Sequence, residues 1–290
     1  MAQMLANIII VAARYGLTAL GLSLIYRCAG YLDFGQGAMF LAGAYAAYEF
    51  SVHAQFPLVV ALPLGAVAAA VGGLAVDQLI YRPLRRKERP VFAIMLASLG
   101  LLVIVENAIA LRFSDAALSL PLGDPRPGHL LLGARVTDQQ MVIMAAAIGV
   151  ASAAAAYLRF TRTGLRLRAL GSDRVLVTML GAPTQDLFVT SAFLGSLLSG
   201  TAGALSALEL DMYPTVGSDA LLPAVLIALL GGAGNMRGAL LAGLIMAALE
   251  GLVGTYISLL WREAAAFVVV LALIYVRPRG LFSRRGGQLA

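Results

Sequence analysis

Long apolar stretches dominate this sequence, and they leave it few ways to fold. Runs such as residues 91–113 and 137–158 reach about 20 residues, the length of α-helix that crosses a hydrocarbon core of about 30 Å. Only 12% of the residues are charged and 60% are hydrophobic, whereas about a quarter of the residues of a soluble domain are charged. A soluble domain cannot bury so much apolar surface. We therefore expect an all-α polytopic transmembrane helical bundle.

Nine apolar segments are candidate spans, so we expect about eight to ten crossings within a single transmembrane domain over residues 1–290. The segments are 4–26, 33–50, 57–81, 91–113, 137–158, 186–208, 219–232, 236–256 and 261–277. The second and seventh are the shortest and least regular, so either could be broken or re-entrant. The first is expected to be a retained span, because no basic region of a cleaved signal peptide precedes it.

Basic residues cluster in three segments between or after these spans: 82–89, 159–174 and 277–285. Two predicted crossings separate the first two segments and four separate the second from the third, so all three lie on one face of the membrane. Short cytoplasmic loops carry an excess of arginine and lysine. This face and the C-terminus are therefore predicted to be cytoplasmic, and the N-terminus outside. The formal charge of +6 then reflects this bias, and we expect no nucleic-acid partner.

Residues 159–182 form a polar, arginine-rich segment between two apolar ones. Because leucines alternate with its arginines, it offers spaced apolar anchors together with charge. Such a segment could be a helix that docks into a partner's groove, an amphipathic helix in the membrane interface, or a solvated basic loop. We favour one docking helix over residues 166–182, since a solvated loop would not need so many leucines.

Polar residues at the start of the second span are costly in lipid unless they face a cavity or the protein interior. They include Asp33, Gln36, Gly37 and Tyr45, and we predict that these line the path of a polar solute. Glycines would let the backbone open and expose helix-end donors and acceptors to that solute. The alternative is that Asp33 caps a helix at the interface while the glycines pack against neighbouring helices.

Acidic residues also occur within other predicted spans. Glu250 lies within its span without an evident partner in the sequence, so it is either half of a buried structural pair or part of the solute path. We expect Glu106 to pair with Arg112, and Asp77 to belong to a basic rim with Arg82.

Small residues recur every four positions in the sixth span, at Gly195, Ser199, Gly203 and Ala207. Such a stripe lets helices approach closely in a membrane, where no hydrophobic effect drives their association. It predicts either close packing within the chain or a seam between two membrane chains.

Motifs of common catalytic, metal and nucleotide sites are missing. Lys87 is the only lysine, and it does not follow a glycine as the lysine of a Walker A phosphate-binding loop does. Cys28 is the only cysteine, and His53 and His129 lie far apart without a carboxylate at ligand spacing, so we expect neither a disulfide nor a metal site. The chain is expected to be no enzyme and to carry no cofactor.

Short motifs are spread over nearly the whole chain. They lie at residues 21–26, 32–40, 43–45, 81–85, 97–100, 162–181, 230–238 and 276–282. Together they resemble the permease subunits of ABC importers for branched-chain amino acids, of the LivH type. This chain has Asp33-Phe-Gly-Gln-Gly where that family often has Asn-Phe-Ala-His-Gly, and its Gly-Gln pair is closer to the partner permease of the LivM type.

The resemblance implies a transmembrane permease of a bacterial inner membrane. It would move branched-chain or related amino acids, or a similar small polar solute such as urea or a carboxylate, into the cytoplasm by alternating access. The implied partners are a second permease (LivM type in a heterodimer, or a homodimer), two cytoplasmic ATP-binding subunits, a periplasmic solute-binding protein and membrane lipid. ATP hydrolysis by the partner chains would drive transport.

The resemblance also places the ATPase contact in the arginine-rich segment. The coupling residues that it implies are Arg166, Arg168, Leu170, Asp173, Arg174, Leu176, Leu180 and Gly181. The alternative function is a secondary transporter or channel that works without ATP, for which Glu106 and Glu250 would be the candidate ion-coupling carboxylates.

Overall fold

Helices make up nearly all of the computed structural model, which describes residues 2–120, 128–131, 134–179, 181, 183–256, 261–277 and 280–282. Among these residues, one helix corresponds to each of the nine predicted spans. The nine are α1 (Ala2–Ala29), α2 (Gly35–Val52), α3 (Leu58–Val76), α5 (Val91–Phe113), α6 (Asp138–Phe160), α9 (Thr184–Ser206), α10 (Val216–Leu230), α11 (Met236–Tyr256) and α12 (Arg262–Val276). The expected all-α bundle is thereby confirmed.

Shorter elements connect these helices. A π-helical turn, η1 (Asp77–Tyr81), and α4 (Arg82–Arg86) continue α3, while α7 (Arg162–Leu170) and α8 (Arg174–Met179) follow α6. Strands β1 (His129–Leu131) and β2 (Ala134–Val136) form an antiparallel pair in which His129 lies opposite Val136.

Six of the helices are long and apolar enough to cross a membrane: α1, the continuous helix Leu58–Arg86, α5, α6, α9 and α11. On α5 and α6, large apolar side chains such as Phe92, Leu111 and Ile148 point away from the bundle, as expected for surfaces in contact with lipid. The chain is a multi-pass membrane protein. Helices α2 and α10 are indeed short, with 18 and 15 residues, but each is one continuous helix, so neither is broken.

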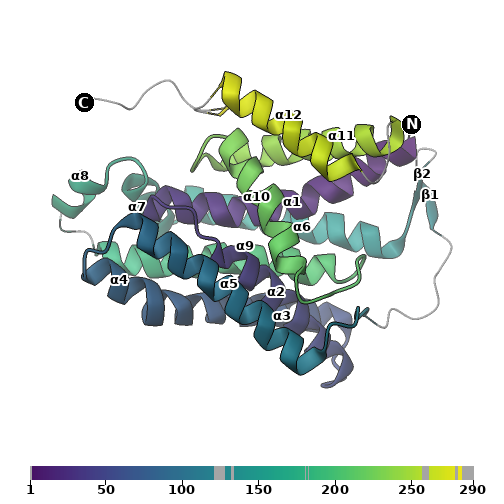
Figure 1. Ribbon diagram of the computed structural model, residues 1–290, viewed down its shortest axis with the longest axis horizontal. Helices are drawn as coiled ribbons and strands as arrows, with labels where there is room; N and C mark the ends of the chain where they lie inside the picture. Colours follow the sequence, from purple (N-terminus) through teal and green to yellow (C-terminus); the bar gives the residue numbers. More distant parts are fainter. Residues whose placement is uncertain are drawn as a thin grey trace.

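Helix α9 lies in the centre and packs against α1, α2 and α3 (Figure 1). Its small-residue stripe faces these neighbours: a Cβ atom on Gly195 would lie 2.6 Å from the Ile25 side chain of α1, and one on Gly203 would overlap the Phe40 carbonyl of α2. Ser199 hydrogen-bonds to α2 through Gln36. The stripe therefore serves packing within the chain, and a seam between two chains at this stripe is ruled out.

The basic segments gather at one end of the bundle. Figure 1 shows α4, α7 and α8 together at the left, whereas the start of α1 and the β1–β2 pair lie at the right. The α10–α11 turn reaches the same left end, because Gly171 after α7 and Gly234 in that turn both adjoin Arg27 near the end of α1: a Cβ atom on either glycine would lie within 3.2 Å of Arg27. The Leu281 N–H in turn donates to the Leu230 carbonyl over 2.8 Å, which brings the C-terminal segment there too.

The arginine-rich segment differs from the single helix expected over residues 166–182. The Thr161 hydroxyl caps α7 by accepting the Gly164 N–H over 3.0 Å, and α7 ends before a turn at Gly171. The Asp173 carboxylate then accepts the Leu176 N–H at the start of α8 over 2.9 Å. Two caps thus divide the segment into two short helices, while positions 180 and 182 lie outside the described residues.

The close approach of α2 and α9 gives a stability prediction. A Cβ atom on Gly43 would overlap the backbone of Gly200, whereas one on Gly149 in α6 would meet nothing within 4 Å. Gly43→Ala is expected to destabilise the protein by about 1–3 kcal/mol through overpacking, and Gly149→Ala to leave it unchanged or slightly more stable. Thermal unfolding of the purified variants in detergent measures this. Equal transition temperatures for the two variants would contradict the packing described.

Candidate functional site

A buried carboxylate lies in the connection between α1 and α2. Asp33 is 3% exposed. Its Oδ1 accepts the Tyr81 hydroxyl over 2.6 Å and the Gly35 N–H over 3.0 Å, and its Oδ2 accepts the Gln36 side-chain amide over 3.3 Å. Asp33 therefore accepts the first N–H of α2 from a buried position, next to the N-cap residue Phe34, and it also binds a side chain from a different helix.

Gln36 extends this network into the bundle. The Ser199 hydroxyl, in the middle of α9, donates to Gln36 Oε1 over 2.6 Å. Gly37 has another role, since a Cβ atom there would lie 2.8 Å from the Gly217 carbonyl of α10. Gly37 lets α10 approach α2, while Gln36 connects Asp33 to the centre of the protein.

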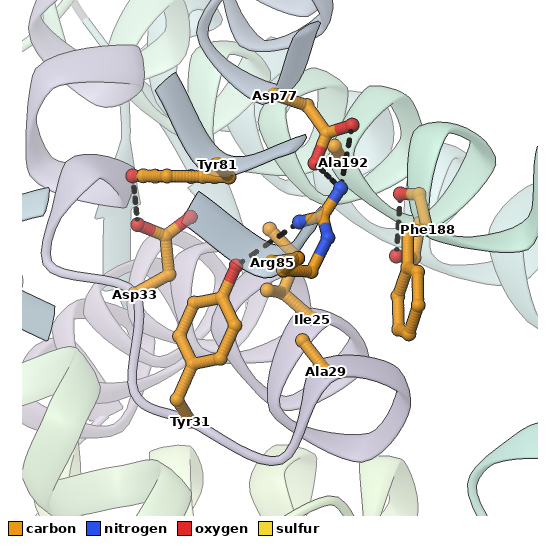
Figure 2. A pocket seen from close by; sticks show the side chains of 10 residues that line it. Ile25, Ala29, Tyr31, Asp33, Asp77, Tyr81, Arg85, Phe188 and Ala192 are labelled. Carbon is orange, nitrogen blue, oxygen red and sulfur yellow. Dashed lines mark hydrogen bonds and ion pairs between the residues drawn. The ribbon is translucent and has the colours of Figure 1, made fainter. Parts of the chain in front are cut away.

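A buried ion pair lies beside Asp33. Arg85 Nη2 donates to both carboxylate oxygens of Asp77, over 2.8 and 3.0 Å, and the Arg85 guanidinium lies 4.8 Å from the centre of the Phe188 ring. Arg85 also approaches the Tyr31 hydroxyl at 3.5 Å, as Figure 2 shows. Asp77 was expected at the rim with Arg82, but its partner is Arg85, two helical turns away along η1 and α4.

Two small cavities adjoin this network. One is lined by Tyr31, Asp33, Asp77, Tyr81 and Arg85 among others, and has a volume of about 10 Å³ (Figure 2). The second has a similar volume and includes Gln36 and Ser196 in its lining. Each has about the space that one water molecule needs, so neither holds an amino acid in this conformation.

The remaining candidates for the solute path lie elsewhere. The Tyr45 ring packs 5.0 Å from that of Phe113, and its buried hydroxyl finds no hydrogen-bond partner among the described residues. Glu250 accepts the Tyr15 hydroxyl on both carboxylate oxygens, each at 3.1 Å, and its Oε2 lies 3.8 Å from Arg262 Nε. The structure thus joins Asp33 to Gln36, and neither Tyr45 nor Glu250 lines the two cavities.

The expected pairing of Glu106 with Arg112 is wrong. Glu106 Oε1 accepts the backbone N–H and the hydroxyl of Ser218 at the start of α10, over 3.0 and 2.6 Å, and Arg112 pairs with Glu49 over 2.9 Å. Six residues along an α-helix correspond to a rotation of about 240°, which turns Glu106 and Arg112 toward different neighbours.

Sequence reasoning missed Tyr31, Tyr81 and Arg85 as members of the network. Tyr81 and Arg85 follow Asp77 at intervals of four residues, a spacing that places side chains on one helix face. That spacing was a usable signal for the ion pair. The contact of Tyr81 with Asp33 spans 48 residues and had no local signal.

The predicted coupling residues are divided between the core and the surface. Leu170 is 2% exposed and packs in the core, whereas Leu176 is 53% exposed. Arg166 is exposed, and Arg168 is half-buried with its Nη2 donating to the Arg159 carbonyl over 3.3 Å. Of the four further members, one lies in a helix cap, one lies in a turn, and the side chains of the other two are not described. Asp173 caps α8, Gly181 follows it with φ +72°, and the Arg174 side chain and Leu180 are not described.

The sequence matches known proteins along nearly its whole length. The family profile described as branched-chain amino acid transport system / permease component matches residues 4–276. The chain is 25% identical to the high-affinity branched-chain amino acid transport system permease protein LivH of Salmonella typhimurium, over 97% of this chain and 95% of that protein. It is 24% identical to the permease protein BraD of Pseudomonas aeruginosa over the same shares. A probable branched-chain amino acid transport permease of Methanocaldococcus jannaschii is also 24% identical, over 91% of this chain and 87% of that one.

The buried ion pair gives a second stability prediction. Arg85→Leu leaves the Asp77 carboxylate buried without its cation, and is expected to cost about 3–5 kcal/mol. The double variant Asp77→Leu with Arg85→Leu removes both charges, so most of that stability should return. Thermal unfolding in detergent compares the two. A double variant as unstable as Arg85→Leu alone would show that side-chain packing, and not the lone charge, causes the loss.

Proposed function

This chain belongs to the family of permease components of branched-chain amino acid transport systems, and we propose that it is the transmembrane subunit of an ABC importer for branched-chain or related amino acids. The observation that carries the proposal is the match of residues 4–276 to that family. The relatives that are named for branched-chain amino acid transport are covered along nearly their whole length. Separate ATPase chains would supply the energy.

The helices α7 and α8 have the features of a surface that docks an ATPase. The inner side of α7 is fixed to the bundle by Gly164, Leu167 and Leu170, which are buried. On the outer side, Leu176 and Met179 of α8 are 53% and 79% exposed. Because the buried residues fix these helices to the bundle, a partner could bind the exposed apolar pair and the neighbouring arginines without detaching the helices.

These helices also have a physical route to the polar network. Leu167 and Leu170 belong to the same hydrophobic cluster as Tyr31, Tyr81 and Phe188. The Cys28 thiol of α1 lies 3.9 Å from the Leu167 carbonyl. A shift of α7 would therefore change the packing around the residues that bind Asp33 and Arg85.

The proposed importer has a defined orientation and composition. The end that carries α4, α7 and α8 would lie in the cytoplasm of a bacterium, with the N-terminus outside the inner membrane. The partners would be a second permease, two ATP-binding subunits and a periplasmic solute-binding protein. Asp33 and Gln36, which line the cavities, are our first candidates for the solute path. Gly37, Tyr45 and Glu250 are further candidates, which would join the path in another conformation.

The dependence of uptake on ATP tests the proposed function. Vesicles that contain this chain together with the second permease, the ATPases and the binding protein of the same transport system should accumulate leucine only when ATP is supplied inside. Omission of the ATPase chains is the control and should abolish uptake. Uptake that persists without them and follows an imposed proton gradient would support an ATP-independent secondary transporter instead.

The docking surface can be tested by charge reversal. Arg166→Glu with Leu176→Asp replaces an exposed cation and an exposed apolar anchor, so we expect at least tenfold less ATPase to co-purify, which corresponds to about 1.4 kcal/mol of binding. Arg89→Glu is the matched control, since Arg89 is an exposed basic residue outside α7 and α8. Equal recovery of ATPase with both variants would exclude this surface.

A further inference from the structure

The two small cavities lie on either side of one hydrogen bond. Both are lined by Asp33, Tyr81 and Ala192. The first also contacts Tyr31, Asp77 and Arg85, in the part of the network next to α4. The second contacts Gln36, Gly73 and Ser196, toward the middle of α9. The bond from the Tyr81 hydroxyl to Asp33, over 2.6 Å, is thus at the boundary between them.

The backbone next to this bond is adapted to it. A Cβ atom on Gly35 would lie 2.6 Å from Tyr81 Oη and 2.9 Å from Asp33 Oδ1. Only glycine at position 35 therefore leaves room for the tyrosine to reach the carboxylate. Tyr81 itself is the last residue of the π-helical turn η1, and single π-helical turns within α-helices are frequent at functional sites.

We infer that the Tyr81–Asp33 hydrogen bond is a gate between the α4 end of the bundle and the polar interior at Gln36 and Ser196. With the bond formed, the polar crevice is divided into two spaces of the size of a water molecule. When the tyrosine moves away, the spaces join along Asp33. Gating by this bond rests on the proposed function, because it assigns the bond a role in transport.

The contacts of α7 give the gate a means of control. Leu167 and Leu170 pack in the same cluster as Tyr81, while Arg85 is a positioning residue that ties Asp77 on η1 to the Phe188 ring of α9. A partner that displaces α7 would act on η1 through these contacts. The gate would then open in step with the docking of the ATPase.

The accessibility of Ser196 tests the gate. Ser196 lines the inner cavity and is 1% exposed. In a Cys28→Ser background, which removes the only native thiol, Ser196→Cys should react slowly with a water-soluble methanethiosulfonate reagent in membranes. Adding Tyr81→Phe deletes only the hydroxyl that bonds Asp33. It should raise the labelling rate about tenfold, since the loss of one buried hydrogen bond shifts an opening equilibrium by about that factor.

A second variant and a matched control sharpen the test. Gly35→Ala should also raise the labelling rate, because its methyl group would push Tyr81 away from Asp33. Tyr31→Phe removes a hydroxyl of the outer cavity whose contact with Arg85 is long, at 3.5 Å, and it should leave the rate unchanged. Ser23→Cys reports on general loosening, because Ser23 is fully buried in α1 and lines neither cavity.

Several results would overturn the gate. These are equal rates at Ser196→Cys with and without Tyr81→Phe, an equal increase with Tyr31→Phe, or an equal increase at Ser23→Cys. Labelling needs neither ATP nor partner chains. A negative labelling result would therefore leave ATP-dependent uptake standing, and a failure of that uptake would leave the labelling result standing.

Discussion

The close contact of α9 with three neighbouring helices is the constraint on which the rest of the structure depends. Lipid is as apolar as a leucine side chain, so helices in a membrane gain little from burying apolar surface and associate through close van der Waals contact. Here glycines on α9 meet the backbones of α1 and α2, and Ser196 meets Gly73 of α3. Because these helices pack so closely around α9, the Gln36 side chain can bind both Asp33 and Ser199.

Polar groups in this bundle are stabilised mainly by residues that are distant in the sequence. Asp33 is bound by Tyr81, Gln36 by Ser199, Glu106 by Ser218 and Glu250 by Tyr15. An acid in a membrane is tolerable only if protein replaces the water that it has lost. Each of these contacts therefore ties two distant segments together as well as satisfying a polar group, and a movement that separates the segments leaves the polar groups in need of new partners.

Features that depend on neighbouring residues could be predicted from the sequence, whereas contacts between residues far apart in the chain could not. Apolar length alone located all nine helices, and the counting of arginines placed α4 and α7 at the same end, as observed. The arginine-rich segment forms two helices because Thr161 caps the start of α7 and Asp173 caps the start of α8. The second cap can be recognised in the sequence only once a turn at Gly171 is assumed. The partner of Glu106 could not be found, because Ser218 lies 112 residues away and only the fold brings it near.

Within the candidate site, Asp33 and Gln36 were identifiable because polar residues at a span entrance are costly. Tyr81 was not, since a tyrosine at the end of a span ordinarily marks the membrane interface. Its role becomes visible only when the hydroxyl is seen to reach a carboxylate on another segment. The chemistry of a membrane site is thus predicted better for the groups that lipid excludes than for the groups that lipid tolerates.

Arg27, near the end of α1, connects segments from three parts of the chain. Gly171 after α7 and Gly234 of the α10–α11 turn both adjoin Arg27 closely enough that a Cβ atom on either would meet it. The C-terminal segment adjoins the end of α10 and this turn through Gly280 and Leu281. These segments meet at one residue, so a movement of α7 that displaces Arg27 would also act on the α10–α11 turn and the C-terminal segment. A spectroscopic probe placed near Leu281 would then report the position of α7 without touching the surface that a partner would occupy.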